Sequence, residues 1–230
     1  MSLPLILSVE TATLAGSVCL SRGDEILGVV TGDASISHSN TLLADVDKLL
    51  KETQIELPQI DLFAVATGPG SFTGLRIGIA TIKALAVTLD CPTAGIPTLE
   101  AVALSGGVSA ETVALLPAGR GEVFAQLFSV LGPDVVEPLD EAAHIPPARL
   151  FERYGHLETV TWCGEGAIAN RELITSWMTN RDWTIAQQTN SLASHVSSLA
   201  FTRFKRDQFE NPFALRAIYV RPADAQLKVQ

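Results

Sequence analysis

A run of closely spaced glycines constrains this chain more than any other feature. Residues 67–80 read Thr-Gly-Pro-Gly-Ser-Phe-Thr-Gly-Leu-Arg-Ile-Gly-Ile-Ala and lead into residues 80–89, which continue a helix predicted to begin at Phe72. Gly74 and Gly78 fall inside the start of that helix, where each glycine costs about 1 kcal/mol relative to alanine. Such a cost indicates that backbone comes close to another group. That group is a phosphate, another element of the same fold, or another protein.

A phosphate site is one interpretation, because the run follows a predicted strand at 62–66 and opens a helix. In that position backbone N–H groups and the helix dipole face an anion. However, a P-loop needs four residues between its glycines and then Lys-Ser or Lys-Thr, whereas Gly74 is followed by Leu-Arg. The other candidate is the turn after the first strand, where Glu10 stands in place of an aspartate and no glycine follows until Gly16. We therefore expect no cofactor, or weak nucleotide binding through Thr11 and Thr13 of a degraded turn.

A partner-binding face is the second interpretation. Gly70, Gly74 and Gly78 recur every four residues, so on a helix the last two share one face and let another backbone approach. Packing against the chain's own sheet is an open alternative. Aromatic and arginine side chains near the helix start favour a partner. The predicted partner-binding residues, from helices at 40–53 and 72–89, are Leu42, Leu43, Val46, Phe72, Thr73, Gly74, Arg76, Ile77, Gly78, Ala80, Lys83 and Ala84.

Composition and charge exclude several classes of protein. The net charge of −9 over 230 residues argues against a direct nucleic-acid surface, which needs clustered Lys and Arg. The one basic cluster, Arg203 with Lys205 and Arg206, is typical of a solvated helix face. No apolar run reaches the roughly 18 residues of a membrane span, and the N-terminus is typical of a strand rather than a signal peptide. We expect a cytoplasmic protein.

The residues that usually carry metal and redox chemistry are sparse. No two of the four histidines (His38, His144, His156 and His195) lie at i, i+4, so no helical zinc pair can form and no metal site is predicted. The three cysteines (Cys19, Cys91 and Cys163) form no CxxC pair, which indicates reduced core residues. Ser71 lies outside any GxSxG motif. No catalytic residue is predicted.

The order of predicted elements indicates an α/β fold. An antiparallel meander at 3–9, 16–20 and 25–31 precedes a helix at 40–53, a strand at 62–66, the glycine segment with its helix, a strand at 93–96 and a helix from Thr98. This order predicts a mixed sheet with helices on both faces. It is the ribonuclease-H-like half of the actin, Hsp70 and sugar-kinase architecture.

A boundary at Ser105-Gly-Gly107 divides the chain into a first lobe at 1–105, which carries the partner-binding helices, and a smaller second lobe at 106–230. The second lobe is less regular. Its predicted strands lie at 112–116, 123–130 and 159–163, and a helix is predicted from 167 to about 179. A last helix at about 191–206 could pack back on the first lobe.

The segment from Gly68 to Gly78 resembles the signature of the TsaB (YeaZ) family, the bacterial partners of TsaD in making threonylcarbamoyladenosine in tRNA. Other segments are also similar to this family: Leu-Ser-Val-Glu-Thr-Ala-Thr at 7–13, His38-Ser39 before the first helix, Gly-Ile-Pro-Thr-Leu-Glu-Ala at 95–101, Arg-Gly-Glu-Val-Phe at 120–124 and Ile-Tyr-Val-Arg at 218–221. Two departures stand out. Pro117 and Gly119 occupy positions where the family usually has an aspartate and an arginine, and several relatives have an aspartate in place of Glu10.

The resemblance implies a two-lobed actin-like fold and a non-catalytic subunit. It implies that helices of the first lobe bind TsaD, that a second copy can pair through the same surface, and that the ATPase TsaE joins the complex. TsaD would transfer the threonylcarbamoyl group to adenosine 37 of tRNAs that read ANN codons, and this chain would reach tRNA only through the complex. An ATP-dependent enzyme of the sugar-kinase type is the alternative, against which stand the chain length and the altered first turn. A metallopeptidase is a third hypothesis, and the small number of histidines argues against it.

Overall fold

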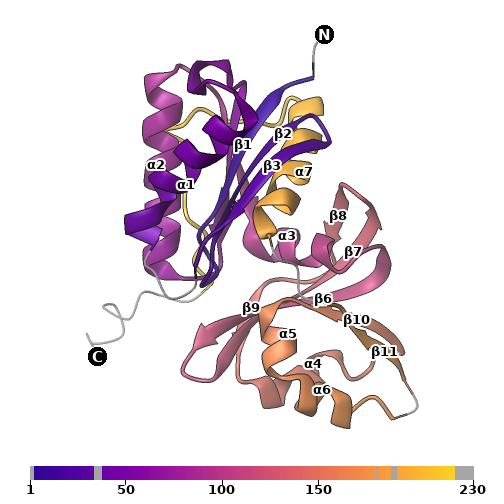
Figure 1. Cartoon of the computed structure of the whole chain (residues 1–230). Coiled ribbons are helices and arrows are strands. Elements are labelled where there is room, and N and C mark those ends of the chain that lie inside the picture. The colour runs from indigo at the N-terminus through magenta and orange to yellow at the C-terminus, as the bar shows by residue number, and fades with distance from the viewer. Residues whose placement is uncertain (1–2, 34–37, 180, 188–190, 221–230) are drawn as a thin grey trace. The chain divides into compact units, whose positions relative to one another are not determined.

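The computed structural model describes residues 3–33, 38–179, 181–187 and 191–220. The chain divides into two compact units (Figure 1). Unit 1 comprises Met1–Ala101 and Asn190–Ile218, and unit 2 comprises Val102–Thr189 and Tyr219–Gln230. The chain therefore leaves unit 1 in the first half of its length and returns to it near the C-terminus.

Unit 1 is built on a five-stranded mixed sheet. Its strands are β1 (Leu5–Glu10), β2 (Ser17–Arg22), β3 (Glu25–Thr31), β4 (Leu62–Gly68) and β5 (Thr93–Pro97), in the spatial order β3-β2-β1-β4-β5. The first three strands form the antiparallel meander, and β4 and β5 continue parallel to β1. Every residue of β1 and β4 is buried, as expected of strands covered on both faces. The predicted ribonuclease-H-like sheet is confirmed.

Helices cover both faces of this sheet (Figure 1). On one face α1 (His38–Thr53) packs on β2 and β3, and α2 (Phe72–Thr88) packs on β1, β4 and β5. Alternate residues of β1, namely Leu5, Leu7 and Val9, join these helices in one apolar core. On the other face α7 (Leu192–Lys205) contacts strands β1 to β5, and the Ser197 hydroxyl hydrogen-bonds to that of Ser21 at 2.7 Å.

Unit 2 repeats the same sheet topology. Its strands are β6 (Ser109–Gly119), β7 (Glu122–Gly132), β8 (Val135–Pro138), β10 (Thr159–Cys163) and β11 (Asp182–Ile185), in the order β11-β10-β6-β7-β8. Here too an antiparallel meander comes first, and two further strands run parallel to its first strand. Strand β9 (Ala143–Ile145) pairs with β7. Two units of ribonuclease-H-like topology in one chain make up the actin-like fold, which confirms the predicted fold class.

Short helices complete the chain. They are η1 (Leu57–Gln59) in unit 1, α3 (Thr98–Ser105) at the passage between the units, and η2 (Pro147–Arg149), α4 (Leu150–Tyr154), α5 (Glu165–Ala169) and α6 (Arg171–Ser176) in unit 2. The prediction of a single helix from 167 to about 179 is wrong. The chain forms two short helices because Asn170 ends α5 and precedes α6, and its side-chain amide donates to the Gly166 carbonyl at 2.8 Å.

Candidate functional site

The glycine run packs against the turn that follows β1. A Cβ on Gly70 would lie 2.6 Å from the Cβ of Ala12, and a Cβ on Gly74 would overlap the Thr11 carbonyl oxygen. A Cβ on Gly78 would overlap the Thr11 hydroxyl. Three glycines spaced four residues apart thus give one short turn room to lie against the start of α2.

Hydrogen bonds hold the same contact together. The Thr11 hydroxyl donates to the Gly74 carbonyl at 2.8 Å, and the Ser71 N–H donates to the Ala12 carbonyl at 2.8 Å. Ser71 also caps α2, since its hydroxyl accepts from the Gly74 N–H at 3.2 Å. The helix start and the turn are therefore one interlocked structure in unit 1.

Four predicted partner-binding residues need correction. Gly74 and Gly78 are buried against Thr11, so the close approach that the sequence indicated is made to the chain's own backbone. Leu42 and Val46 are buried in the core between α1 and the sheet. The sequence showed the spacing of these residues but not which side of each helix faces the sheet.

Most of the other predicted residues lie on the outer side of the two helices. Leu43 on α1 and Phe72, Thr73, Arg76, Ala80 and Ala84 on α2 are exposed, and Lys83 is half-buried. Ile77 is half-buried and packs against the core. The Arg76 guanidinium lies 3.9 Å from the centre of the Phe72 ring. Thr73, Ala80, Ala84 and Val87 are exposed and fall on one side of α2, because they are separated by close to whole helical turns. We call these four residues the outer row of α2.

The turn after β1 has its hydroxyls engaged within the chain. Glu10 is buried, and its carboxylate accepts from the Thr13 N–H at 2.7 Å and from the Thr13 hydroxyl at 2.8 Å. Thr11 is buried and donates to Gly74. Both threonines predicted for a nucleotide therefore have intrachain partners, and nucleotide binding at this turn stays a prediction.

The segments that carried the resemblance lie at turns and edges. Pro117 pairs with Val123 in the β6–β7 ladder, and Gly119 lies at the hairpin turn that exposes Arg120. The Ile218 N–H donates to the Thr67 carbonyl at 2.7 Å. Arg221 lies outside the described residues, as does the side chain of His38.

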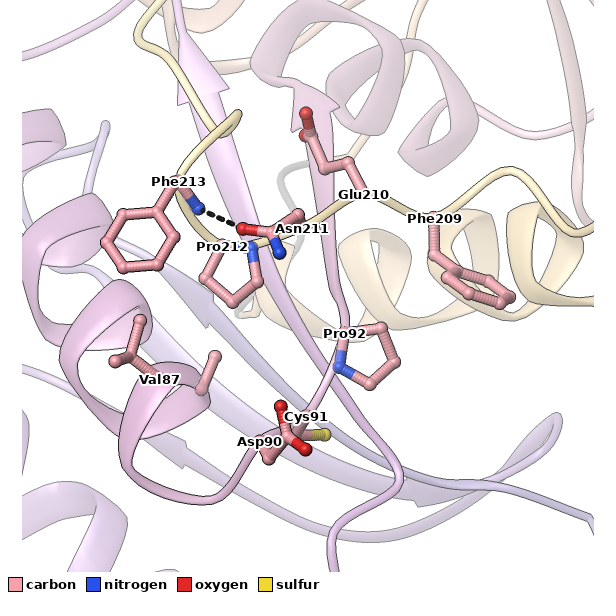
Figure 2. Close-up of a pocket in the computed structure, with 10 residues that line it drawn as sticks. Val87, Asp90, Cys91, Pro92, Phe209, Glu210, Asn211, Pro212 and Phe213 are labelled. Atoms are coloured by element: carbon pink, nitrogen blue, oxygen red, sulfur yellow. Dashed lines mark hydrogen bonds between the residues drawn. The ribbon is translucent and has the colours of Figure 1, made fainter.

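A pocket of about 540 Å³ lies at the C-terminal end of α2 (Figure 2). Its walls come from the end of α2, the turn into β5, and residues 209–213, which cross the start of β5. Glu210 and Thr93 exchange two backbone hydrogen bonds of 2.8 and 2.9 Å. Sequence reasoning missed this pocket because the returning segment gives no periodic signal. The unusual exposure of Phe209 and Phe213 becomes apparent only in the fold.

Comparison with known families identifies the chain. The sequence model described as "TsaD: tRNA N6-adenosine threonylcarbamoyltransferase" matches residues 17–206. The chain belongs to this family. Its relatives include proteins of the TsaB (YeaZ) type, as the sequence resemblance predicted.

Individual relatives support the same placement. The chain is 30% identical over 124 residues to "tRNA threonylcarbamoyladenosine biosynthesis protein TsaB" of Bacillus subtilis, which covers 54% of each chain. It is 33% identical over 125 residues to the protein of the same name in Escherichia coli, which covers 52% of each. The chain thus spans about half the length of the curated relatives it matches. The structure of YeaZ from Pseudomonas aeruginosa shares the fold, with a TM-score of 0.76 at 23% identity over 94% of this chain and 99% of that one.

The thiols of this TsaD-family chain are poor nucleophiles and ligands. Burial raises the pKa of Cys91 to about 11 and that of Cys19 to about 12, and it also raises the pKa of Cys163. Within the described ranges no three His, Cys, Asp or Glu residues are grouped so that they could hold a metal ion. In the same residues no helix is long and apolar enough to cross a membrane.

Proposed function

We propose that this chain is a non-catalytic subunit that binds TsaD and supports threonylcarbamoyl transfer to adenosine 37 of ANN-decoding tRNAs. Membership of the TsaD family and similarity to the TsaB proteins of Bacillus subtilis and Escherichia coli support a role in threonylcarbamoyladenosine synthesis. In this proposal the chain needs no cofactor of its own, and it reaches tRNA only through the complex.

The outer row of α2 is the observation that carries the proposal. The row lies opposite the buried side of α2 around Ile82 and exposes two alanines, Ala80 and Ala84, between Thr73 and Val87. Small side chains let a partner helix approach closely, and the neighbouring Phe72 and the exposed Leu43 of α1 add apolar contact area. TsaD occupies this face in the proposal, a second copy of the chain competes for it, and TsaE joins the assembled complex.

Co-purification with TsaD from the same organism tests the face directly. Ala84→Glu places a charge in the middle of the outer row while leaving the buried side of α2 unchanged. We expect this variant to unfold like the wild type in urea but to bind TsaD at least about tenfold more weakly, because an unpaired charge would be buried in the interface. Ala110→Glu, an exposed alanine of β6, is the matched control.

Two results would count against the proposal. Unchanged TsaD binding by folded Ala84→Glu would remove the outer row as the binding face. Threonylcarbamoyl transfer to tRNA by this chain in the absence of TsaD would contradict a non-catalytic role.

A further inference from the structure

The pocket at the end of α2 has an apolar rim that no other part of unit 1 covers in the described structure. Phe213 is 69% exposed, Val87 47% and Phe209 40%. Pro92 and Pro212 stand between these side chains (Figure 2). Large apolar side chains gathered around one hollow at the surface are typical of binding sites for protein partners.

Asp90 lies at the point where α2 ends. The Cys91 N–H donates to the Ala86 carbonyl at 2.9 Å, which is the six-residue closure of a Schellman motif. Asp90 occupies the left-handed position of this motif with φ of +52°, where glycine or asparagine is usual. A carboxylate here also lies at the negative end of a 17-residue helix. The residue is therefore poorly suited to its local structure.

Among the described residues, no group compensates the Asp90 carboxylate. Among the residues that the structure describes, Asp90 has neither a hydrogen bond nor an ion pair from its side chain. It lies on the α2 side of the pocket beside Cys91 (Figure 2), and Glu210, also without an ion pair in the described structure, lies on the opposite wall. The pocket is thus apolar at its rim and carries one carboxylate on each of two opposite walls.

This combination selects one kind of ligand group. An anion would be repelled by Asp90 and by the helix terminus. A purely apolar group would desolvate the carboxylate without pairing it. A soft metal ion would need several ligands, and among the described residues no three His, Cys, Asp or Glu side chains are grouped to hold one. A cation on an apolar stem satisfies both the rim and the carboxylate.

We infer that this pocket receives an arginine or lysine side chain of a partner protein. The stem of that side chain lies along Val87 and Pro92, the cationic head pairs with Asp90, and the ring of Phe213 adds a cation–π contact. A protein is favoured over a free small cation because the exposed rings of Phe209 and Phe213 extend the apolar surface beyond the cavity itself. The net charge of −9 further favours a basic partner.

NMR titration of the full-length protein with two capped peptides tests the inference. The first probe is acetyl-Leu-Arg-Leu-amide, and the second carries citrulline, a neutral isostere, in place of arginine. We expect amide shifts centred on Val87, Asp90 and Phe213, with the arginine peptide binding at least about fivefold more tightly. Asp90→Asn should abolish that preference, and Asp24→Asn, the same charge change in the β2–β3 turn, should leave it intact.

Two further measurements check that the Asp90→Asn variant is folded and that the ligand is a protein side chain rather than a small cation. Asparagine suits the left-handed position, so Asp90→Asn should unfold at the same urea concentration as the wild type or a higher one. Equal binding of both peptides, or a preference that survives Asp90→Asn, would overturn the inference. Spermidine binding more tightly than the arginine peptide, with the same dependence on Asp90, would overturn the assignment to a protein partner. Ala84→Glu should not affect peptide binding, so this test is separate from that of the outer row.

Discussion

At the scale of single residues, Gly70, Gly74 and Gly78 let the turn after β1 lie directly against the start of α2. The cost of glycine inside a helix correctly indicated that something approaches the backbone closely. What approaches is the chain's own turn at Thr11 and Ala12. Spacing alone does not show this, because a four-residue repeat defines one face of a helix without saying whether the sheet or the solvent lies beyond it.

Replacing Gly74 with alanine tests this internal packing. In an open helix, Gly→Ala would raise the free energy of unfolding by about 1 kcal/mol. Here the new methyl group would overlap the Thr11 carbonyl, so we expect a decrease of about 1–3 kcal/mol, measured by urea denaturation. Ala84→Gly on the outer row is the control, with an expected decrease of about 1 kcal/mol from helix propensity alone. Stabilisation by Gly74→Ala would show that this side of α2 is open.

At the scale of elements, hydrogen bonds and an ion pair from one arginine connect α7 to the rest of unit 1. Arg203, in the last turn of α7, donates through Nη1 to the Gly95 carbonyl of β5 and through Nη2 to the Glu100 carboxylate of α3 at 3.1 Å. Burial is the main influence on Glu100 and raises the pKa of its carboxyl, whereas the nearby guanidinium acts in the opposite direction. Glu100 therefore depends on Arg203 to remain ionised in this position.

Arg203→Met removes the guanidinium but keeps an apolar stem of similar length. We expect the free energy of unfolding at pH 7 to fall by about 2 kcal/mol, because Glu100 is left buried without its partner and the pair is only partly exposed to solvent. Adding Glu100→Gln should recover part of the loss, since a neutral amide costs less to bury. The two single variants and the double variant, compared by urea denaturation, form a double-mutant cycle. Strictly additive effects would show that the two side chains do not interact.

The elements that the sequence predicted correctly are those with a strong hydrophobic pattern. Strands β1 to β5 and helices α1 and α2 were predicted within a few residues, because buried apolar runs and helical periodicity are strong there. Strands β8, β9 and β11 were missed, since each has three or four residues and only partial burial. Partner binding by the exposed residues of α1 and α2 stays a prediction. The pocket depends on segments that lie more than a hundred residues apart in the sequence.

At the scale of the whole molecule, both units have the same sheet order, but the sequence predicted this order only for the first unit. The sequence of the second unit looks irregular because its helices are short and its core combines aliphatic residues with large aromatics, including Trp162, Trp183 and Tyr154. Each unit also buries cysteines, Cys19 and Cys91 in unit 1 and Cys163 in unit 2. Their titration links folding of the whole chain to pH.

Stability should fall in alkaline solution because of these thiols. An unfolded chain releases its thiol protons near pH 9, whereas the folded chain holds that of Cys91 until about pH 11. Between these two pH values the native state binds more protons than the unfolded state. The free energy of unfolding therefore falls as the pH rises, by up to about 1.4 kcal/mol per pH unit for each thiol. Urea denaturation from pH 8 to 10.5 measures the slope. Cys91→Ala should make it shallower, and an unchanged slope would show that Cys91 does not contribute.

The return of α7 to unit 1 makes folding of the first half depend on the last part of the chain. Val196 and Ala200 are fully buried on the face of the sheet that carries Ile6 and Ser8. A chain that ends at Ser105 exposes this whole face. It loses the stabilisation of about 25 cal/mol per Å² that burial of apolar surface provides. We therefore expect residues 1–105 alone to give a poorly dispersed NMR spectrum and no cooperative urea transition. Residues 1–101 joined by a flexible glycine-serine linker to 190–218 should give both a dispersed spectrum and a cooperative transition. Cooperative unfolding of the shorter chain would show that α7 covers unit 1 without being needed for its fold.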